Sequence, residues 1–265
     1  MFVRALFALA LLVPLPALAD ALPPGLQAAL DAPLRADKNR ARDGFRHPGP
    51  VLGFFGVKPD SVVVEIDPGA SGYWTEILAP FLKDRGRYIA ALPEPTSEEA
   101  KRDDKGFADK IAADPAAYGR VETSQFAADR DAIAAPGSAD VVLTFRNLHN
   151  WMAKGEAPAA LKAFFAALKP GGVLGIVDHR GLDSAPQDPL AKSGYVRQDY
   201  AIQLIEAAGF KFAGASEANA NPRDTKDYPV GVWALPPTYR LKEVDRAKYQ
   251  AIGESDRFTL KFVKP

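Results

Sequence analysis

The sequence contains no cysteine among its 265 residues. Disulfide bonds and a lipoprotein anchor, which both need a cysteine thiol, are therefore excluded. The sequence also lacks an excess of charge of either sign, because 33 lysines and arginines balance 33 aspartates and glutamates. Without a basic surplus, the composition does not favour nucleic acid or an anionic membrane surface as a partner. We therefore expect a small-molecule substrate and no nucleic acid.

Long hydrophobic runs are missing too, and the one apolar stretch of note lies at the N-terminus. Arg4 precedes Ala5–Val13, a run that is much shorter than the ~20 apolar residues of a membrane-spanning helix. Ala17-Leu18-Ala19 matches the small-x-small pattern of a signal-peptide cleavage site. We predict a signal peptide over residues 1–19, export to the periplasm or the medium, and no integral membrane segment after cleavage.

The rest of the chain alternates between segments typical of strands and segments typical of helices. Strands are predicted at 61–66, 87–92, 120–126, 139–145, 173–177, 210–213 and 258–263, and helices at 26–34, 36–45, 75–83, 97–113, 157–168 and 197–208. Such alternation indicates an α/β protein with a mostly parallel sheet covered by helices on both faces. The alternating polarity of the last strand suits an antiparallel strand at an edge.

Two regions depart from this alternating pattern. Residues 20–58 are predicted to form a helical N-terminal cap, interrupted at His47-Pro48-Gly49-Pro50. The α/β domain then occupies 59–265. Within it, residues 214–256 are rich in proline, asparagine and aspartate and are predicted to form an irregular excursion before the last strand. The length that remains after the signal peptide suits one large domain better than two.

The segment that joins the first predicted strand to the next helix is the most informative in the chain. The β-branched run Val62–Ile66 carries Glu65 near its end and breaks into the turn Asp67-Pro-Gly-Ala-Ser-Gly72. Glycines let the backbone approach a ligand closely, and the helix N-terminus behind them offers unpaired N–H groups. This unit predicts a nucleotide-binding α/β protein in which Glu65 accepts hydrogen bonds from the ligand.

Three motifs in this order resemble class I S-adenosylmethionine-dependent methyltransferases. They are Glu65–Gly72, Asp140–Trp151 over the fourth strand, and Leu168–Gly172 before the fifth. The resemblance implies the Rossmann-like fold of that family, S-adenosylmethionine as the cofactor, and methyl transfer to an unknown small molecule. It also implies cofactor contacts for Glu65, Asp67, Gly69, Gly72 and Glu94, with Glu94 in place of the usual acid after the second strand.

More narrowly, the chain resembles a family of exported bacterial proteins that are known as predicted methyltransferases. The matching stretches are Arg42–Pro48, Phe54–Pro59, Phe145–Trp151, Asn221–Asp227 and Ile252–Arg257. This resemblance implies the same fold and the same reaction in an exported protein.

Ligands of open parallel sheets bind outside the carboxyl ends of the strands, near the topological switch. This rule predicts that the following residues line one cleft: Glu65, Asp67, Arg146, Asn147, His149, Asp178 and His179. We expect His149 to act as the base, because an imidazole titrates around pH 6.5. Asn147 would hold the acceptor, and Asp178 would orient His149 or His179. The acceptor side is expected to include Tyr73, Trp74, Arg146 and Trp151.

Other interpretations of these residues stay open at this point. Asp178-His179-Arg180 also fits an ion-pair and turn cluster at a strand end. Glu65 or Asp178 with both histidines offers mixed ligands for zinc or iron, but no short ligand spacing supports a site and no metal is predicted. Asp67 occupies the first glycine position of the usual motif. The alternative function is therefore an exported methyltransferase fold that has lost the cofactor and acts as a small-ligand-binding or metal-assisted module.

Overall fold

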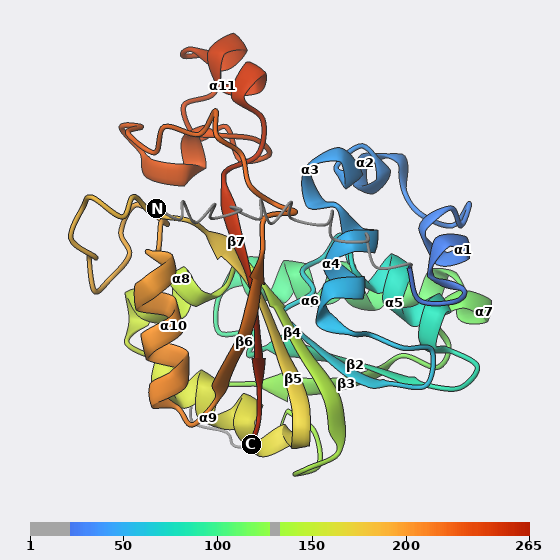
Figure 1. Cartoon of the computed structure of the whole chain (residues 1–265). Helices are drawn as coiled ribbons and strands as arrows, with labels where there is room; N and C mark the ends of the chain where they lie inside the picture. The colour runs from blue at the N-terminus through green and yellow to red at the C-terminus, as the bar shows by residue number, and fades with distance from the viewer. Residues whose placement is uncertain (1–21, 128–132) are drawn as a thin grey trace, which may run out of the picture.

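A computed structural model describes residues 22–127 and 133–265, so the predicted signal peptide lies outside the described residues. Seven strands form one sheet in the order β3-β2-β1-β4-β5-β7-β6. Their bounds are β1 Val62–Ile66, β2 Arg87–Pro93, β3 Glu122–Phe126, β4 Ala139–Phe145, β5 Leu168–His179, β6 Lys211–Ser216 and β7 Arg257–Val263. Only β7 runs against its neighbours, β5 and β6 (Figure 1). The predicted mostly parallel sheet with an antiparallel strand towards one edge is confirmed, and β6 lies outside β7.

The strand order reverses direction between β1 and β4. β1 is built from valine and isoleucine around Glu65, and it pairs in parallel with β2 on one side and β4 on the other, so that Ile66 lies beside both Ala91 and Thr144. The chain leaves β1 towards one half of the sheet and leaves β4 towards the other. The loops after these two strands diverge, and a crevice opens between them at the carboxyl edge of the sheet.

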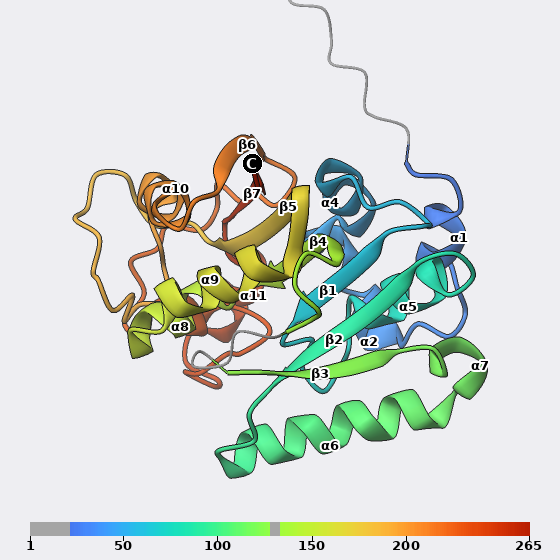
Figure 2. The same ribbon diagram turned by 90° about the horizontal axis from the view of Figure 1, so that it is seen from below.

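Helices cover both faces of the sheet (Figure 2). Successive strand residues point to opposite faces, so Val63 packs with residues of α1, α4, α5, α6 and α7, whereas Val64 packs with residues of α8, α9 and α10. The helices are α1 Leu26–Leu30, α2 Asp37–Arg40, α3 Asp43–Arg46, α4 Pro48–Phe55, α5 Thr75–Leu82, α6 Glu98–Ala113, α7 Pro115–Tyr118, α8 Leu148–Lys154, α9 Ala157–Ala167 and α10 Gln198–Ala207. The doubly wound α/β architecture is therefore as predicted.

The N-terminal segment is helical, but its helices differ from the predicted ones. Two short helices, α2 and α3, replace the longer helix predicted over 36–45, and α4 begins at Pro48, where an interruption was predicted. Proline lacks a backbone N–H, and its φ is fixed near about −65°. Both properties suit the first turn of a helix, where the N–H has no intrahelical acceptor. Pro48 and Pro50 therefore start α4 instead of breaking a helix.

Between β6 and β7 the chain leaves the sheet in the stretch predicted to be irregular. This excursion contains the 3₁₀ turn η1 Gly231–Ala234 and the short helix α11 Arg246–Ile252, and it packs around an apolar cluster that includes Tyr228, Leu235 and Tyr249. In Figure 1 the excursion (red) and the cap (blue) stand on either side of one end of the sheet. No helix in the two described ranges is long and apolar enough to cross a membrane.

Candidate functional site

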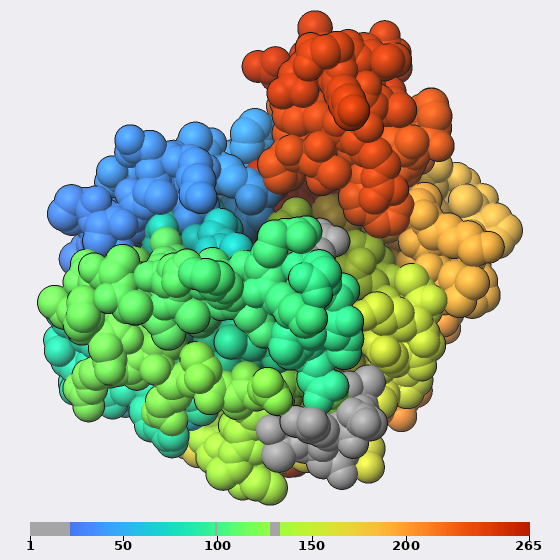
Figure 3. All heavy atoms as spheres, turned by 180° about the vertical axis from the view of Figure 1, so that it is seen from behind, coloured from blue at the N-terminus to red at the C-terminus, as the bar shows by residue number. Residues whose placement is uncertain are grey.

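A cavity of about 400 Å³ opens at the carboxyl edge of the sheet. In Figure 3 the surface is hollowed where the cap (blue), α6 (green) and the excursion (red) meet. Nine of the predicted site residues line it, namely Glu65, Asp67, Gly69, Tyr73, Trp74, Arg146, Asn147, His149 and His179. The crevice expected at the topological switch thus brings together residues from β1, β4 and β5.

The turn after β1 presents its backbone to this cavity. Asp67, Gly69 and Gly72 all have positive φ, at 51°, 64° and 52°. A Cβ built on Gly69 would meet no atom within 4 Å, so a ligand can approach this part of the backbone closely. Gly72 serves packing instead, because a Cβ there would lie 3.0 Å from the side chain of Lys110 on α6. Gly72 does not line the cavity.

Glu65 is a buried carboxyl group at the end of β1. Its Oε2 accepts a hydrogen bond of 2.5 Å from the Tyr88 hydroxyl, which lies 2.8 Å from Thr75 Oγ1. Burial raises the pKa of Glu65 to about 8, although the Tyr88 hydrogen bond acts in the opposite direction. Burial also raises the pKa of Asp67, and the carboxylate of Asp103 on α6 adds to that rise. This side of the cavity therefore carries two carboxyl groups, of which Glu65 keeps its proton up to about pH 8.

His149 is held by a carboxylate on the neighbouring strand. Its Nδ1 lies 2.9 Å from Asp178 Oδ1, and its backbone N–H donates to Asp178 Oδ2 at 3.0 Å. A carboxylate can only accept, so the geometry assigns the proton of neutral His149 to Nδ1. The Nε2 atom of this ring, which lines the cavity, is then an acceptor that no described residue is seen to use. Asp178 is fully buried, and it contacts the ring of His149, whereas from His179 it accepts only the backbone N–H.

His179 sits beside His149, with the two ring centroids 5.1 Å apart. Its Nδ1 lies 2.5 Å from Ser255 Oγ, and its backbone N–H donates to Asp178 Oδ1 at 2.7 Å. Burial lowers the pKa of His179 well below its usual range, and the His149 ring and nearby arginines lower it further. His179 is therefore neutral at pH 7.

His149, Asp178 and His179 are close enough to be considered as metal ligands, since one donor atom of each lies within 4.8 Å of the others. Their donors are largely used, however. Asp178 accepts from His149 Nδ1 and from two backbone N–H groups, and His179 Nδ1 is bonded to Ser255. Two imidazole Nε2 atoms remain, fewer than the three protein ligands of a catalytic zinc site. The donor set does not fit a metal site.

Asn147 occupies the first position before α8 and bridges two strands. Its Nδ2 donates to Ile66 O at 3.2 Å and to Thr144 Oγ1 at 3.1 Å. The predicted contact of Asn147 with the acceptor therefore cannot use this amide N–H group without breaking a buried hydrogen bond. What the side chain does here is fix the β4–α8 segment to the end of β1, and with it the position of His149.

Aromatic side chains form the apolar walls. Trp74 stacks on Phe145 with ring centroids 4.0 Å apart, and Tyr73 meets Trp74 edge to face at 5.0 Å. Trp233, on the excursion, contacts His149 with centroids 6.1 Å apart. Flat apolar groups fit such walls.

Trp151, predicted to line the acceptor side, lies elsewhere. Its ring packs between Phe126 and Phe164 in the core, at centroid distances of 5.5 and 5.3 Å. Trp151 and His149 are two residues apart on α8, and at about 100° per residue their side chains leave the helix on nearly opposite sides. His149 faces the cavity, so Trp151 must face the core. Glu94, which directly follows β2, also does not line the cavity.

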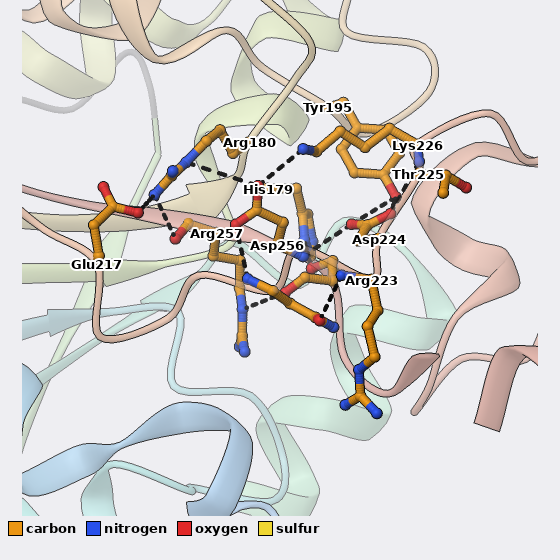
Figure 4. A network of polar contacts seen from close by, with 12 residues as sticks. His179, Arg180, Tyr195, Glu217, Arg223, Asp224, Thr225, Lys226, Asp256 and Arg257 are labelled. Carbon is orange, nitrogen blue, oxygen red and sulfur yellow. Dashed lines mark hydrogen bonds and ion pairs between the residues drawn. The ribbon is translucent and has the colours of Figure 1, made fainter. Parts of the chain in front are cut away.

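The excursion is fixed to the sheet by a polar network (Figure 4). Asp224 accepts from the Tyr195 hydroxyl at 2.9 Å and from the Asp256 backbone N–H at 2.8 Å. Lys226 forms an ion pair with Asp256 at 2.9 Å, and Arg180, just after β5, forms one with Glu217 at 2.8 Å. The Tyr195 and Arg180 contacts join the excursion to the segment that follows β5, and the Asp256 contacts join its two ends.

Several residues that line the cavity were not predicted as site residues, namely Arg46, Asp103, Glu254 and Ser255. The polar run Glu254-Ser255-Asp256-Arg257, at the start of the last strand, could have indicated that these residues reach the cavity. Because β7 is antiparallel to β5, its first residue Arg257 pairs with His179, the last residue of β5. Residues before an antiparallel strand therefore reach the same edge as residues after a parallel one.

Solved structures share this fold at low sequence identity. A SAM-dependent methyltransferase from Aquifex aeolicus has a TM-score of 0.56 and 18% identity over 88% of this chain and 95% of that chain. An arsenic(III) S-adenosylmethionine methyltransferase from Chlamydomonas reinhardtii gives 0.53 and 13% over 92% and 75%. The [4+2]-cyclase SpnF gives 0.55 and 14% over 83% and 80%. No protein-family model and no curated protein sequence matches the chain.

Proposed function

We propose that the protein transfers a methyl group from S-adenosylmethionine to a small molecule bound in the cavity. The observation that carries this proposal is the His149–Asp178 pair, which lies in the same cavity as the open glycine turn after β1. The fold, shared with S-adenosylmethionine-dependent methyltransferases, supports the same cofactor here.

The residues present fit the cofactor. Gly69 leaves the backbone open to a ligand, and Asp67 and Glu65 place carboxyl groups beside it. When bound, the cofactor would supply a methyl group on a positively charged sulfur, and the carboxyl oxygens of Glu65 and Asp67 would lie on that side of the cavity. Glu65, Asp67 and Gly69 would contact it directly. Gly72 would contribute indirectly, because it lets α6 pack against the turn. Glu94 remains the proposed cofactor contact in the loop after β2.

His149 is the proposed base. Its Nε2 takes the proton from a hydroxyl or amine of the acceptor, and the freed electron pair becomes the nucleophile. Asp178 keeps the other ring nitrogen protonated and stabilises the imidazolium that forms, as a buried carboxylate does for the base in other acid–base pairs. Asn147 and His179 are positioning residues, since Asn147 fixes the segment that carries His149 and neutral His179 packs against its ring. Tyr73, Trp74 and Arg146 would form the acceptor side.

The first test is a calorimetric titration of the purified protein with S-adenosylmethionine and S-adenosylhomocysteine. We expect micromolar dissociation constants, because the glycine turn and acidic groups are already formed. Gly69→Trp should abolish binding by filling the open space. Gly171→Trp is the matched control, since Gly171 has the same left-handed φ and equally open surroundings outside the cavity. Folded protein that binds neither compound would contradict the proposal and favour a cleft without the cofactor.

Export is a further part of the proposal, and it rests on residues 1–19 and on the resemblance to exported proteins. N-terminal sequencing of the protein recovered from a periplasmic fraction is the test. A mature N-terminus at Asp20 is expected, whereas a chain that keeps Met1 would contradict export.

A further inference from the structure

Three arginines, Arg42, Arg46 and Arg257, form ion pairs with the carboxylate of Glu254. Glu254 Oε1 accepts from Arg42 Nε at 2.6 Å, and its Oε2 accepts from Arg257 Nη1 at 3.0 Å. Burial would raise the pKa of Glu254, but the positive charges of Arg257, Arg46 and Arg42 outweigh it and lower this pKa to about 2. Glu254 is therefore ionised and fully used by Arg42 and Arg257.

Arg46 and Arg146 are less well matched. Arg46 is 5% exposed, and its Nε has no hydrogen-bond partner; it forms only a long ion pair of 3.8 Å with Glu254 Oε2, a carboxylate that already accepts from Arg42 and Arg257. Its guanidinium lies 4.3 Å from the centre of the Tyr73 ring. Within the described part of the chain, the guanidinium of half-buried Arg146 has no hydrogen bond or ion pair.

The electrostatics of these two side chains indicate excess positive charge. Burial, and after it the positive charge of Arg42, lowers the pKa of Arg146 to about 10. Burial lowers the pKa of Arg46 well below its usual range, and Arg146 is the largest charge that adds to this effect. An anion between the two groups would relieve both the missing hydrogen bonds and the mutual repulsion.

Both arginines line the cavity, Arg46 from α3 and Arg146 from the residue after β4. Arg146 stands three residues before His149, and the carboxylate of Asp178 is among the charges that act on it. The positive charges of Arg146 and Arg46 both lower the pKa of His179. The two arginines also share a second, small cavity with Trp74 and Phe145, the stacked aromatic wall. A ligand anion bound here would therefore lie beside the proposed base and next to a flat apolar surface.

We propose that Arg46 and Arg146 form a carboxylate-binding subsite, and that the molecule methylated is a small, flat organic acid. Guanidinium groups bind carboxylates through paired N–H donors in one plane, and the surrounding rings exclude water from the contact. This inference rests on the proposed methyl transfer for the role of the acid as acceptor, but the anion site itself does not depend on the cofactor. The cofactor also carries a carboxylate, so the test must separate the two sources.

The experiment is a calorimetric titration with benzoate and with its uncharged analogue benzamide, in the presence of saturating S-adenosylhomocysteine. The wild-type protein should bind benzoate at least tenfold more tightly than benzamide. Arg46→Met and Arg146→Met should each weaken benzoate binding at least tenfold and leave benzamide binding unchanged. Arg223→Met, at an exposed arginine of the excursion, is the matched control and should change neither.

Equal affinities for acid and amide in the wild-type protein would overturn the subsite, and this comparison needs no variant to fold. If Arg146→Met weakens S-adenosylhomocysteine at least tenfold, spares 5′-methylthioadenosine, which lacks the amino-acid part, and leaves benzoate unaffected, the carboxylate belongs to the cofactor and the acceptor assignment is wrong. If S-adenosylhomocysteine does not bind but benzoate is still preferred over benzamide, the subsite stands and the methyl transfer proposal fails.

Discussion

At the scale of single residues, the site depends on groups whose neighbours have already fixed their protonation. Asp178 directs the His149 proton to Nδ1, and burial with nearby positive charge keeps His179 neutral. Two histidines with ring centroids 5.1 Å apart thus have different roles. In the proposed reaction, His149 offers Nε2 to the acceptor and His179 is its uncharged neighbour.

His149→Gln should lower the rate of methyl transfer by about 10²- to 10⁴-fold, the range expected for loss of a general base. The dissociation constant for S-adenosylhomocysteine should stay within twofold, because His149 is assigned to the acceptor side. The measurement is the release of S-adenosylhomocysteine with an acceptor that the wild-type protein methylates. His47→Gln, on the cap and outside the cavity lining, is the control and should retain the rate. An unchanged rate in His149→Gln would remove the histidine from the mechanism.

Glu65 makes the stability of the protein depend on pH. Burial raises its pKa from 4.5 in the unfolded chain to about 8 in the folded protein. Between these values the folded state holds a proton that the unfolded state releases. The stabilisation from this group is therefore complete below pH 4.5 and is lost as the pH rises through 8, at up to about 1.4 kcal/mol per pH unit.

Glu65→Gln should remove this part of the pH dependence, because an amide of the same shape can still accept from Tyr88 and does not titrate. Urea unfolding at pH 5.5 and pH 7.5 is the measurement. Over these two pH values the wild-type free energy of unfolding should fall by roughly 3 kcal/mol more than that of the variant. Parallel pH profiles would mean that Glu65 ionises in the folded state as it does in water.

At the scale of elements, the sequence predicts best where local pattern decides the structure. The valine-rich β1 and the apolar β4 were predicted within one residue, because strands covered on both faces need continuous apolar runs. β5 was predicted too short at both ends. It pairs with β4 from Ala139 onward and with β7 as far as Arg257, and these partners are distant in sequence.

The same distinction explains the errors in the site. The glycine turn and the segment that carries His149 follow from local spacing, since each is one strand followed by one helix. Arg42 lies in a charged segment of the N-terminal region, yet it pairs with Glu254, a residue 212 positions away. Asp103 belongs to a charged stretch of α6, yet it lines the cavity. Whether a charged residue is buried depends on its partner, and this partner can lie in a distant segment of the chain.

At the scale of the whole molecule, three parts of the chain build one cavity. The strands of the sheet end at the cavity, and Tyr73 in the turn after β1 lines it. The cap contributes Arg46, and the excursion contributes Trp233 and Glu254. The cap and the excursion also bond to each other through Arg42 and Glu254. A ligand in the cavity therefore touches every part of the fold, and its binding energy should stabilise the chain as one unit.

S-adenosylhomocysteine at one hundred times its dissociation constant should raise the free energy of unfolding by about 2.7 kcal/mol, as mass action requires for a ligand that binds only the folded state. Because the cavity walls come from all three parts, near-ultraviolet circular dichroism and tryptophan fluorescence should report a single thermal transition that shifts as a whole. Trp74 and Trp233 report from the turn after β1 and from the excursion, while Trp151 reports from the core on the other face of the sheet. Two transitions, of which the ligand shifts only one, would show that the excursion or the cap unfolds apart from the sheet and that the cofactor site does not need it.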